Sequence, residues 1–197
     1  RDPPIALFAR NARGEFVVRL NVRGNLWARL VYQFAHELCH VLADPRTFTV
    51  DRFTWIEEAL CETASLFALE RLASDWAETP PYPNWREYAG ALADYKAKRV
   101  SDPMHSPPPG VPFTTWLAQR LPLLESDAGR RDDNTVIAKG LLPIFAADRG
   151  AWRALRYLHS GPRSSARSPA GFMQQWAAAC PMRCRGAVRS LGDLIGI

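Results

Sequence analysis

Apolar residues at the start of the chain occur in two short runs separated by turn-forming residues, a pattern typical of two β-strands. The runs are residues 5–10 (IALFAR) and 15–22 (EFVVRLNV), and residues 11–14 (NARG) between them have the composition of a tight turn. The pattern predicts an antiparallel hairpin.

From residue 25 onward the apolar positions recur at steps of three and four residues, which is the spacing of one face of a helix. The residues that set this spacing are Leu26, Leu30, Phe34, Leu38 and Val41. They predict a helix over about residues 25–43, and Asn25 is suited to its N-cap. A second long helix is predicted over about residues 54–76. Its core candidates are Ile56, Leu60, Ala64, Phe67 and Leu69.

Prolines at positions 80, 81 and 83 end the second long helix, and further helical segments follow. These predicted helices cover residues 84–99, 113–126, 132–148, 150–158, 169–179 and 183–194, and a proline-rich connector spans residues 100–112. Together the elements predict an α+β fold, with a small N-terminal β-sheet and a mostly helical C-terminal lobe. We expect one domain, in which residues 1–79 hold the sheet and the two long helices, and residues 80–197 form the helical lobe.

Composition narrows the class of protein. The chain has 197 residues, of which 47% are hydrophobic, and can therefore bury an ordinary core. Its formal net charge of +5 comes mostly from arginines that are spread along the chain. Because they are not clustered among aromatic residues, we expect no nucleic-acid partner. No apolar run approaches the roughly 20 residues of a membrane-spanning helix, so we also expect no membrane partner. The oligomeric state stays open.

The four cysteines do not form the dense pattern of a disulfide scaffold. They are Cys39, Cys61, Cys180 and Cys184. Each is either a small buried residue or half of a disulfide, within the pair 39 and 61 or the pair 180 and 184. The chain begins with Arg1 rather than methionine, so we expect a trimmed or processed form. Its location stays open, and a secreted or periplasmic protein is favoured over a cytoplasmic one.

Residues 36–40 read HELCH within the first predicted helix. His36 and His40 are four residues apart, so both imidazoles project from one face of the helix and can bind one zinc ion. Glu37 lies beside that face, where a carboxylate can take a proton from a water that zinc holds. The motif predicts a single Zn²⁺ with two histidine ligands and Glu37 as the general base.

The second long helix carries three carboxylates within an otherwise apolar segment, WIEEALCETA. A catalytic zinc needs a third protein ligand and an open position. Glu58 and Glu62 are four residues apart and share a face on which a zinc ion, or a histidine bound to it, would be a suitable partner. Either glutamate can be the third ligand. Glu57 points about 100° away and is expected to be solvated.

HELCH followed by WIEEALCE resembles the gluzincin metallopeptidases, whose pattern is HExxH on one helix and a glutamate ligand on the next. The intervening residues 41–57 and the form W-x-x-E-A are most similar to the aminopeptidase-type branch. The resemblance covers about residues 16–69 and implies a zincin-like fold, with Glu58 as third zinc ligand. It also implies that Glu62 orients a ligand histidine. Ala59 stands where the family commonly has glycine, and no GxMEN-type exopeptidase motif is present.

Peptide hydrolysis also needs a donor for the oxyanion of the tetrahedral intermediate. In gluzincins this donor is a tyrosine or histidine well downstream of the zinc ligands. His159 is the first candidate and Tyr157 the second, although either can instead cap a helix C-terminus. His105, in the proline-rich connector, is a third candidate as a residue of a lid.

The sequence therefore favours a zinc-dependent metallopeptidase that hydrolyses a peptide or protein substrate. Endo- and exopeptidase activity both stay open. The alternative is a zinc-stabilised binding or sensing domain with the same fold and little or no activity. A DNA-associated protease is a third hypothesis, but no cysteine-rich ribbon accompanies the positive charge.

Overall fold

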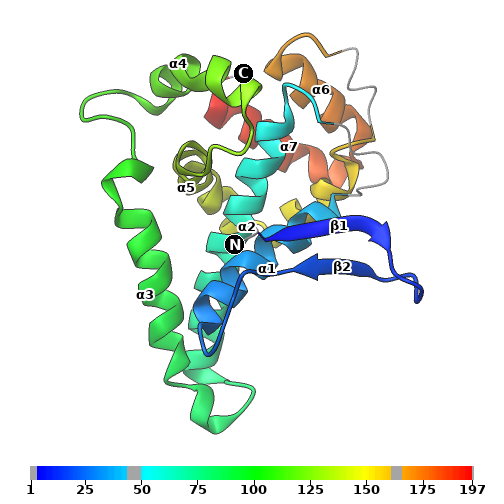
Figure 1. Ribbon diagram of the computed structural model, residues 1–197. Coiled ribbons are helices and arrows are strands. Elements are labelled where there is room, and N and C mark those ends of the chain that lie inside the picture. Colours follow the sequence, from blue (N-terminus) through cyan, green and yellow to red (C-terminus); the bar gives the residue numbers. More distant parts are fainter. Residues whose placement is uncertain (1–3, 44–49, 161–165, 197) are drawn as a thin grey trace.

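The computed structural model describes residues 4–43, 50–160 and 166–196, apart from the side chain of Phe8, and has a small sheet followed by helices. The sheet is an antiparallel hairpin of β1 (Ile5–Arg10) and β2 (Phe16–Arg19). Ala6 pairs with Val18 and Leu7 with Val17, and the register is irregular between Leu7 and Arg10. The predicted hairpin and the predicted α+β arrangement are both confirmed (Figure 1).

Helices make up most of the described chain after the hairpin. The α-helices are α1 (Trp27–Leu42), α2 (Thr54–Glu78), α3 (Tyr88–Ser101), α4 (Phe113–Ser126), α5 (Arg131–Ala147), α6 (Pro169–Ala179) and α7 (Met182–Ile195). Short 3₁₀-helices are η2 (Pro83–Trp85), η3 (Pro103–His105) and η4 (Arg149–Tyr157). Among the described residues, no helix has both the length and the apolar character needed to cross a bilayer.

Two details of the helices differ from the prediction. Leu26, not Asn25, occupies the N-cap of α1, and no side chain caps this helix. Asn25 instead lies in the preceding turn, where its carbonyl accepts a hydrogen bond from the Trp27 backbone N–H at 2.9 Å. The segment predicted as a helix over residues 150–158 is the 3₁₀-helix η4, which the Asp148 side chain caps through the Gly150 N–H.

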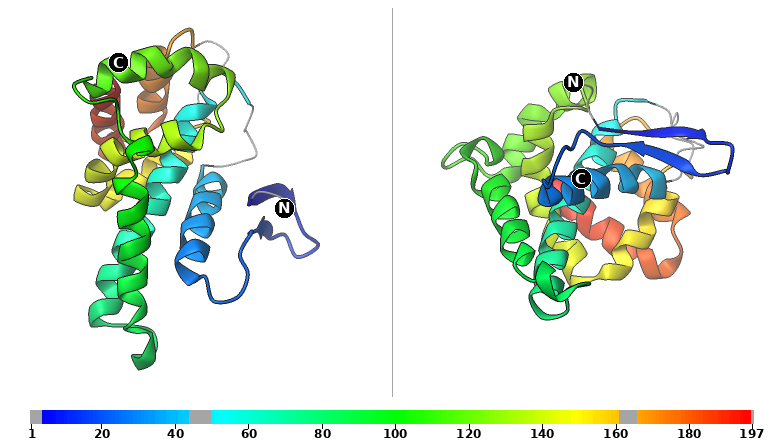
Figure 2. Two further views of the ribbon diagram at one scale, coloured as in Figure 1. Left: turned by 60° about the vertical axis from the view of Figure 1, so that its left-hand side comes forward. Right: turned by 60° about the horizontal axis from the view of Figure 1, so that its bottom comes forward.

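Helix α1 lies between the hairpin and α2, as the left view of Figure 2 shows. It buries several polar residues: His36 faces α2, Gln33 accepts a hydrogen bond from the Asn21 N–H, and Glu37 lines a cavity beside β1. The apolar residues that predict the helix lie largely on its other side, where Phe34 is 44% exposed and Leu38 is 37% exposed. The amphipathic pattern of α1 is therefore reversed with respect to the core.

The hydrophobic core lies mainly among α2 and the helices that follow it. One large cluster joins Trp55 and Leu60 of α2 to Phe145 of α5, Trp176 of α6 and Leu191 of α7. The residues before and after position 80 therefore share one core. In this core the indole N–H of Trp176 donates a 2.9 Å hydrogen bond to the carbonyl of Ala154. A smaller cluster packs α1, α2, α3 and α5 together beside it.

Adjacent leucines of α4 provide a matched test of this packing. Leu124 is fully buried, whereas Leu123 is 42% exposed. We expect Leu124→Ala to lower the free energy of unfolding by about 2–5 kcal/mol, because it leaves a cavity in the core. Leu123→Ala is expected to change it by only about 0.5 kcal/mol. Urea denaturation of both variants measures the difference, and equal losses would contradict this description of the core.

Candidate metal centre

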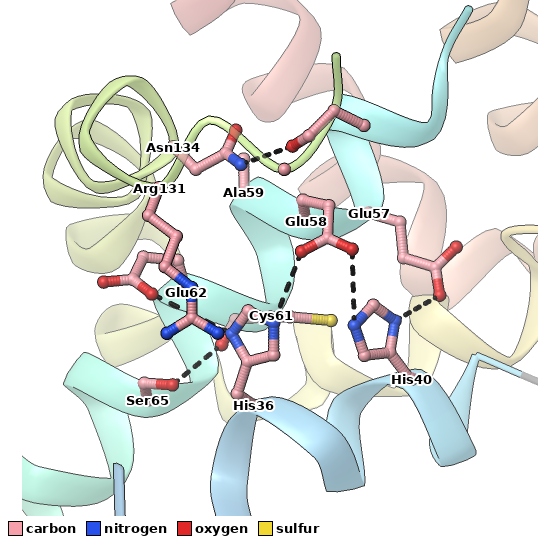
Figure 3. Close-up of polar contacts among 12 residues, drawn as sticks. His36, His40, Glu57, Glu58, Ala59, Cys61, Glu62, Ser65, Arg131 and Asn134 are labelled. Carbon is pink, nitrogen blue, oxygen red and sulfur yellow. Dashed lines mark hydrogen bonds and ion pairs between the residues drawn. The ribbon is translucent and has the colours of Figure 1, made fainter. Parts of the chain in front are cut away.

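The candidate site lies where α1 packs against α2, and the helical repeat determines which side chains meet there. His36 and His40 project from α1 toward α2, and Glu57, Glu58 and Glu62 project from α2 toward the two imidazoles (Figure 3). Steps of four residues on α1 and on α2 place these groups on facing sides of the two helices.

Glu58 is positioned between the two imidazoles. Its Oε2 lies 3.3 Å from His36 Nε2, and its Oε1 lies 3.6 Å from His40 Nε2. The Glu58 side chain keeps 25% of its surface exposed, while the two histidine side chains keep only 9% and 11%. Two imidazole nitrogens and one carboxylate thus converge on one point at the edge of a buried interface.

The other nitrogen of each imidazole faces a second carboxylate. His40 Nδ1 lies 2.8 Å from Glu57 Oε1, which is hydrogen-bond distance. His36 Nδ1 lies 3.8 Å from Glu62 Oε2, which is close enough for an ion pair but too long for a hydrogen bond. This arrangement leaves the two Nε2 atoms directed at Glu58. Carboxylates on the far side of ligand histidines fix their tautomer and orientation in metal sites.

These contacts change the pKa values of His40, Glu57 and Glu58. Burial alone would lower the pKa of His40, but its hydrogen bond with Glu57 and the charge of Glu58 raise that pKa to about 9. Burial alone would raise the pKa of Glu57, but hydrogen bonds with His159 and His40 hold it at about 2. The pKa of Glu58 is also lowered, because His36 and His40 outweigh the effect of its burial. The carboxylates of Glu57 and Glu58 therefore stay charged at neutral pH.

Glu57 is buried, so the expectation that it is solvated is wrong. Its side chain is 1% exposed, and its second oxygen lies 2.9 Å from Nε2 of His159, whose side chain is also 1% exposed. His159 thus lies behind Glu57, on the side away from the carboxylate of Glu58. Tyr157 lines a separate pocket, with Leu42 and Trp152. The structure brings neither predicted oxyanion donor to the metal-facing side of the histidines.

His105 lies elsewhere as well. It is 2% exposed and links the end of α3 to the start of α5, since its Nδ1 lies 2.5 Å from the Arg99 carbonyl and its Nε2 lies 3.1 Å from Asp132. The Lys139 ammonium donates to the carbonyl of His105 at 2.7 Å. These contacts give His105 a place in the helical packing, away from the two zinc-motif histidines.

Glu62 is held by a buried network. Its Oε1 accepts hydrogen bonds from the hydroxyls of Tyr32 and Thr135, the latter at 2.9 Å, and pairs with Arg99 at 3.2 Å. Burial and then the charge of Glu62 raise the pKa of Tyr32 well above its ordinary value, so the phenol remains a donor. Sequence reasoning missed Tyr32, although it lies one helical turn before His36 on the same face of α1.

Cys61 is a further group that sequence reasoning did not assign to the metal. Its sulfur and one nitrogen each of His36 and His40 all lie within 4.8 Å of one another. Burial, and then a hydrogen bond with Cys39, raise the pKa of the Cys61 thiol, so it is protonated at neutral pH. All four cysteines are free and buried. The sequence does hold a signal for this position, because Cys61 follows Glu58 by three residues and therefore lies on the same face of the helix.

A cavity of about 650 Å³ opens onto the histidines from the side of the hairpin. Its polar wall consists of His36, Glu37, His40 and Glu58, with Arg131 from the start of α5. The opposite wall is residues 4–7 and Ala9, in and beside β1, and Gly129 completes the rim. Cys61 does not line this cavity and has no exposed surface. The cavity therefore meets the Glu58 side of the two imidazoles.

The donor set suits a zinc ion. Imidazole nitrogen and carboxylate oxygen are both ordinary zinc ligands, and three protein ligands beside an open cavity are typical of a catalytic site. Glu57, Glu58 and Glu62 place three carboxylates around two imidazoles, and among the described residues Glu58 forms ion pairs only with these histidines. A divalent cation at this point would offset that negative charge.

Comparisons with protein-family models, with curated proteins and with solved structures find no match for this chain.

In protein stripped of metal with a chelator, we expect stability to depend on pH through His40. Its pKa is raised from 6.5 to about 9, so its contribution is complete below pH 6.5 and is lost as the pH rises through 9. The urea midpoint should fall over this range, and Glu57→Gln should reduce the fall because it removes the main partner of the imidazolium. Equal falls in the wild type and in Glu57→Gln would contradict the assignment of this pH dependence to the His40–Glu57 pair.

Proposed function

We propose that the protein is a zinc-dependent peptidase of the gluzincin type, which hydrolyses bonds in a peptide or protein substrate. The observation that carries the proposal is the carboxylate of Glu58, which faces Nε2 of both His36 and His40 while Glu37 lines the same cavity. The resemblance of HELCH and WIEEALCE to the gluzincin pattern supports the same function.

His36, His40 and Glu58 are the residues that would hold zinc. Glu57 and Glu62 lie behind them: the Glu57 carboxylate orients His40 through a hydrogen bond, and the Glu62 carboxylate faces Nδ1 of His36 at 3.8 Å. When bound, zinc supplies a Lewis acid that polarises the scissile carbonyl and makes a water more acidic.

Glu37 moves the proton in this proposal. It is 4% exposed and lines the cavity beside both histidines, so its carboxylate is within the space a substrate would enter. Glu37 accepts a proton from the attacking water as the water oxygen forms a bond to the carbonyl carbon. The C–N bond then breaks, and the proton passes from Glu37 to the nitrogen of the leaving amine.

Strand β1 provides the surface on which a peptide can lie. Residues 4–7 and Ala9 line the cavity opposite the histidines, and in the described part of the chain β1 pairs with β2 alone. Its remaining backbone donors and acceptors are therefore available to an extended chain. Pairing of a substrate with a strand edge supplies affinity through main-chain hydrogen bonds.

A second function has one observation in its favour. Cys61 lies close enough to His36 and His40 to act as a ligand, and a site of two histidines, a glutamate and a cysteine would have no open position. Such a site would stabilise a binding or sensing domain without catalysis. Cobalt substitution distinguishes the two, because a Cys61 ligand would give a thiolate-to-cobalt charge-transfer band that Cys61→Ser removes.

The first test is Glu37→Gln. We expect the zinc-loaded variant to keep its metal and to lose at least about 100-fold in kcat, since general acid–base catalysis contributes roughly 10²–10⁴. Incubation with a diverse peptide mixture, followed by mass spectrometry, measures the cuts made by each protein. Cuts that appear equally in both proteins, or zinc-loaded wild type that makes none, would refute the peptidase proposal.

Removal of the carboxylates behind the imidazoles should weaken zinc binding, whereas proton transfer depends on Glu37. We expect Glu57→Gln to weaken zinc binding by about 10–100-fold, as loss of such a hydrogen-bonded partner does in other metal sites. Glu62→Gln should weaken it less, because Glu62 faces His36 Nδ1 at 3.8 Å without a hydrogen bond. Competition with a fluorescent chelator measures the affinity. Glu70→Gln on the same helix is the control, because Glu70 pairs with Lys96 away from the histidines. An effect no larger than that of the control would contradict these roles.

A further inference from the structure

Arg131 is the cationic residue of the cavity that the proposed reaction does not use. It is the first residue of α5 and lines the cavity together with His36, Glu37, His40 and Glu58. In Figure 3 its side chain extends from the start of α5 toward His36 of α1. The guanidinium therefore lies in the space that a substrate would occupy.

Local contacts fix the loop before α5, and with it the backbone of Arg131. The Asp127 carboxylate accepts a hydrogen bond from the Gly129 N–H at 3.0 Å. The Asn134 amide donates to the Ala128 carbonyl at 2.7 Å. These bonds tie the loop both to itself and to the first turn of α5.

The two neighbouring arginines of this loop differ in their partners. Arg130 donates to the Asp133 carboxylate at 2.6 Å and does not line the cavity. Within the described residues, the side chain of Arg131 has no hydrogen bond or ion pair, although the negative groups of the cavity are nearby. An arginine that is held at a cavity wall without an acidic partner is ready to bind an anion from outside the protein.

The remaining lining of the cavity limits what that anion can be. Besides Arg131 it consists of the two histidines, two carboxylates and a wall of small and aliphatic residues. An unmodified peptide brings a negative charge to Arg131 as a carboxylate, and the planar guanidinium matches a carboxylate with two parallel hydrogen bonds. The carboxylate must be near the scissile bond, because Arg131 and Glu37 share one cavity of about 650 Å³.

We infer that Arg131 is a substrate-binding residue that gives this site a preference for peptides with a carboxylate close to the scissile bond. The carboxylate belongs either to an aspartate or glutamate side chain or to the C-terminus of the substrate. This inference rests on the proposed peptidase function, but it concerns binding and can be measured without turnover.

The binding test uses zinc-loaded Glu37→Gln protein and a set of short N-acetylated peptides. Aspartate or glutamate is placed at each position in turn, with asparagine or glutamine in the matched peptide, and each peptide is made with a free and with an amidated C-terminus. We expect carboxylate peptides to bind about 10–100-fold more tightly than their amide counterparts, the range of a charge-assisted hydrogen bond. The two arms identify the source of the carboxylate.

Three further variants, each made in the Glu37→Gln protein, test whether Arg131 causes the preference for carboxylate peptides. Arg131→Gln should abolish it and Arg131→Lys should keep part of it. Arg130→Gln removes the same charge from the adjacent position and should leave it unchanged, since Asp133 retains Arg120 at 3.5 Å as a partner. Zinc content and urea midpoints confirm that each variant is folded.

The outcomes separate the two proposals. If Arg131→Gln retains the preference, the carboxylate is bound by the metal or by another group, and the inference is wrong. It is equally wrong if the Glu37→Gln protein does not distinguish carboxylate from amide peptides or binds neither. If zinc-loaded wild type cleaves no peptide, the peptidase proposal fails by itself, and the binding result still decides the role of Arg131.

Discussion

The arrangement of α1 and α2 depends on how three buried or half-buried carboxylates are compensated where these helices meet. Glu62 has the hydroxyls of Tyr32 and Thr135 together with Arg99, and Glu57 lies between two imidazoles. Both are buried and have partners on more than one side, and the two imidazoles lower the pKa of Glu57. In the part of the chain that the structure describes, Glu58 has only the Nε2 atoms of His36 and His40 as partners. It is the least compensated of the three and also the most exposed, and it faces a cavity, so the negative charge is concentrated where a cation can enter.

That polar interface explains the unusual orientation of α1. A helix normally turns its apolar stripe toward the core, but α1 turns its histidines and Glu37 toward α2 or the cavity, and leaves Phe34 and Leu38 partly exposed. Polar, directional contacts with Ser65 and the glutamates of α2 therefore add to the apolar packing of Tyr32 and Cys39 in holding α1. The Ser65 hydroxyl, for example, donates to the Tyr32 carbonyl at 2.8 Å, which locks the two helices at one register.

The same reversal shows what the sequence could and could not predict. Periodicity identified the hairpin and both long helices, because the spacing of apolar residues reports that a helix exists. It does not report which face is buried when a polar site replaces the core. Glu57 illustrates the difficulty: a position 100° from Glu58 suggests solvent, yet His40 and His159 from two distant segments enclose it. Tyr32, Arg99 and Thr135 were missed for the same reason, since tertiary packing alone brings them to Glu62.

Whether the centre is open or closed depends on which side of the imidazoles a metal ion would occupy. Glu58 and the cavity lie on one side, while Cys61 is fully buried and hydrogen-bonded to Cys39. A thiol whose pKa is raised by burial must lose a proton before it can bind zinc, whereas the pKa of Glu58 is lowered and its carboxylate is already charged. The electrostatics therefore favour a metal on the side of Glu58, next to Glu37 and to the cavity. On that side the fourth position faces space rather than protein, which is the condition that hydrolysis requires.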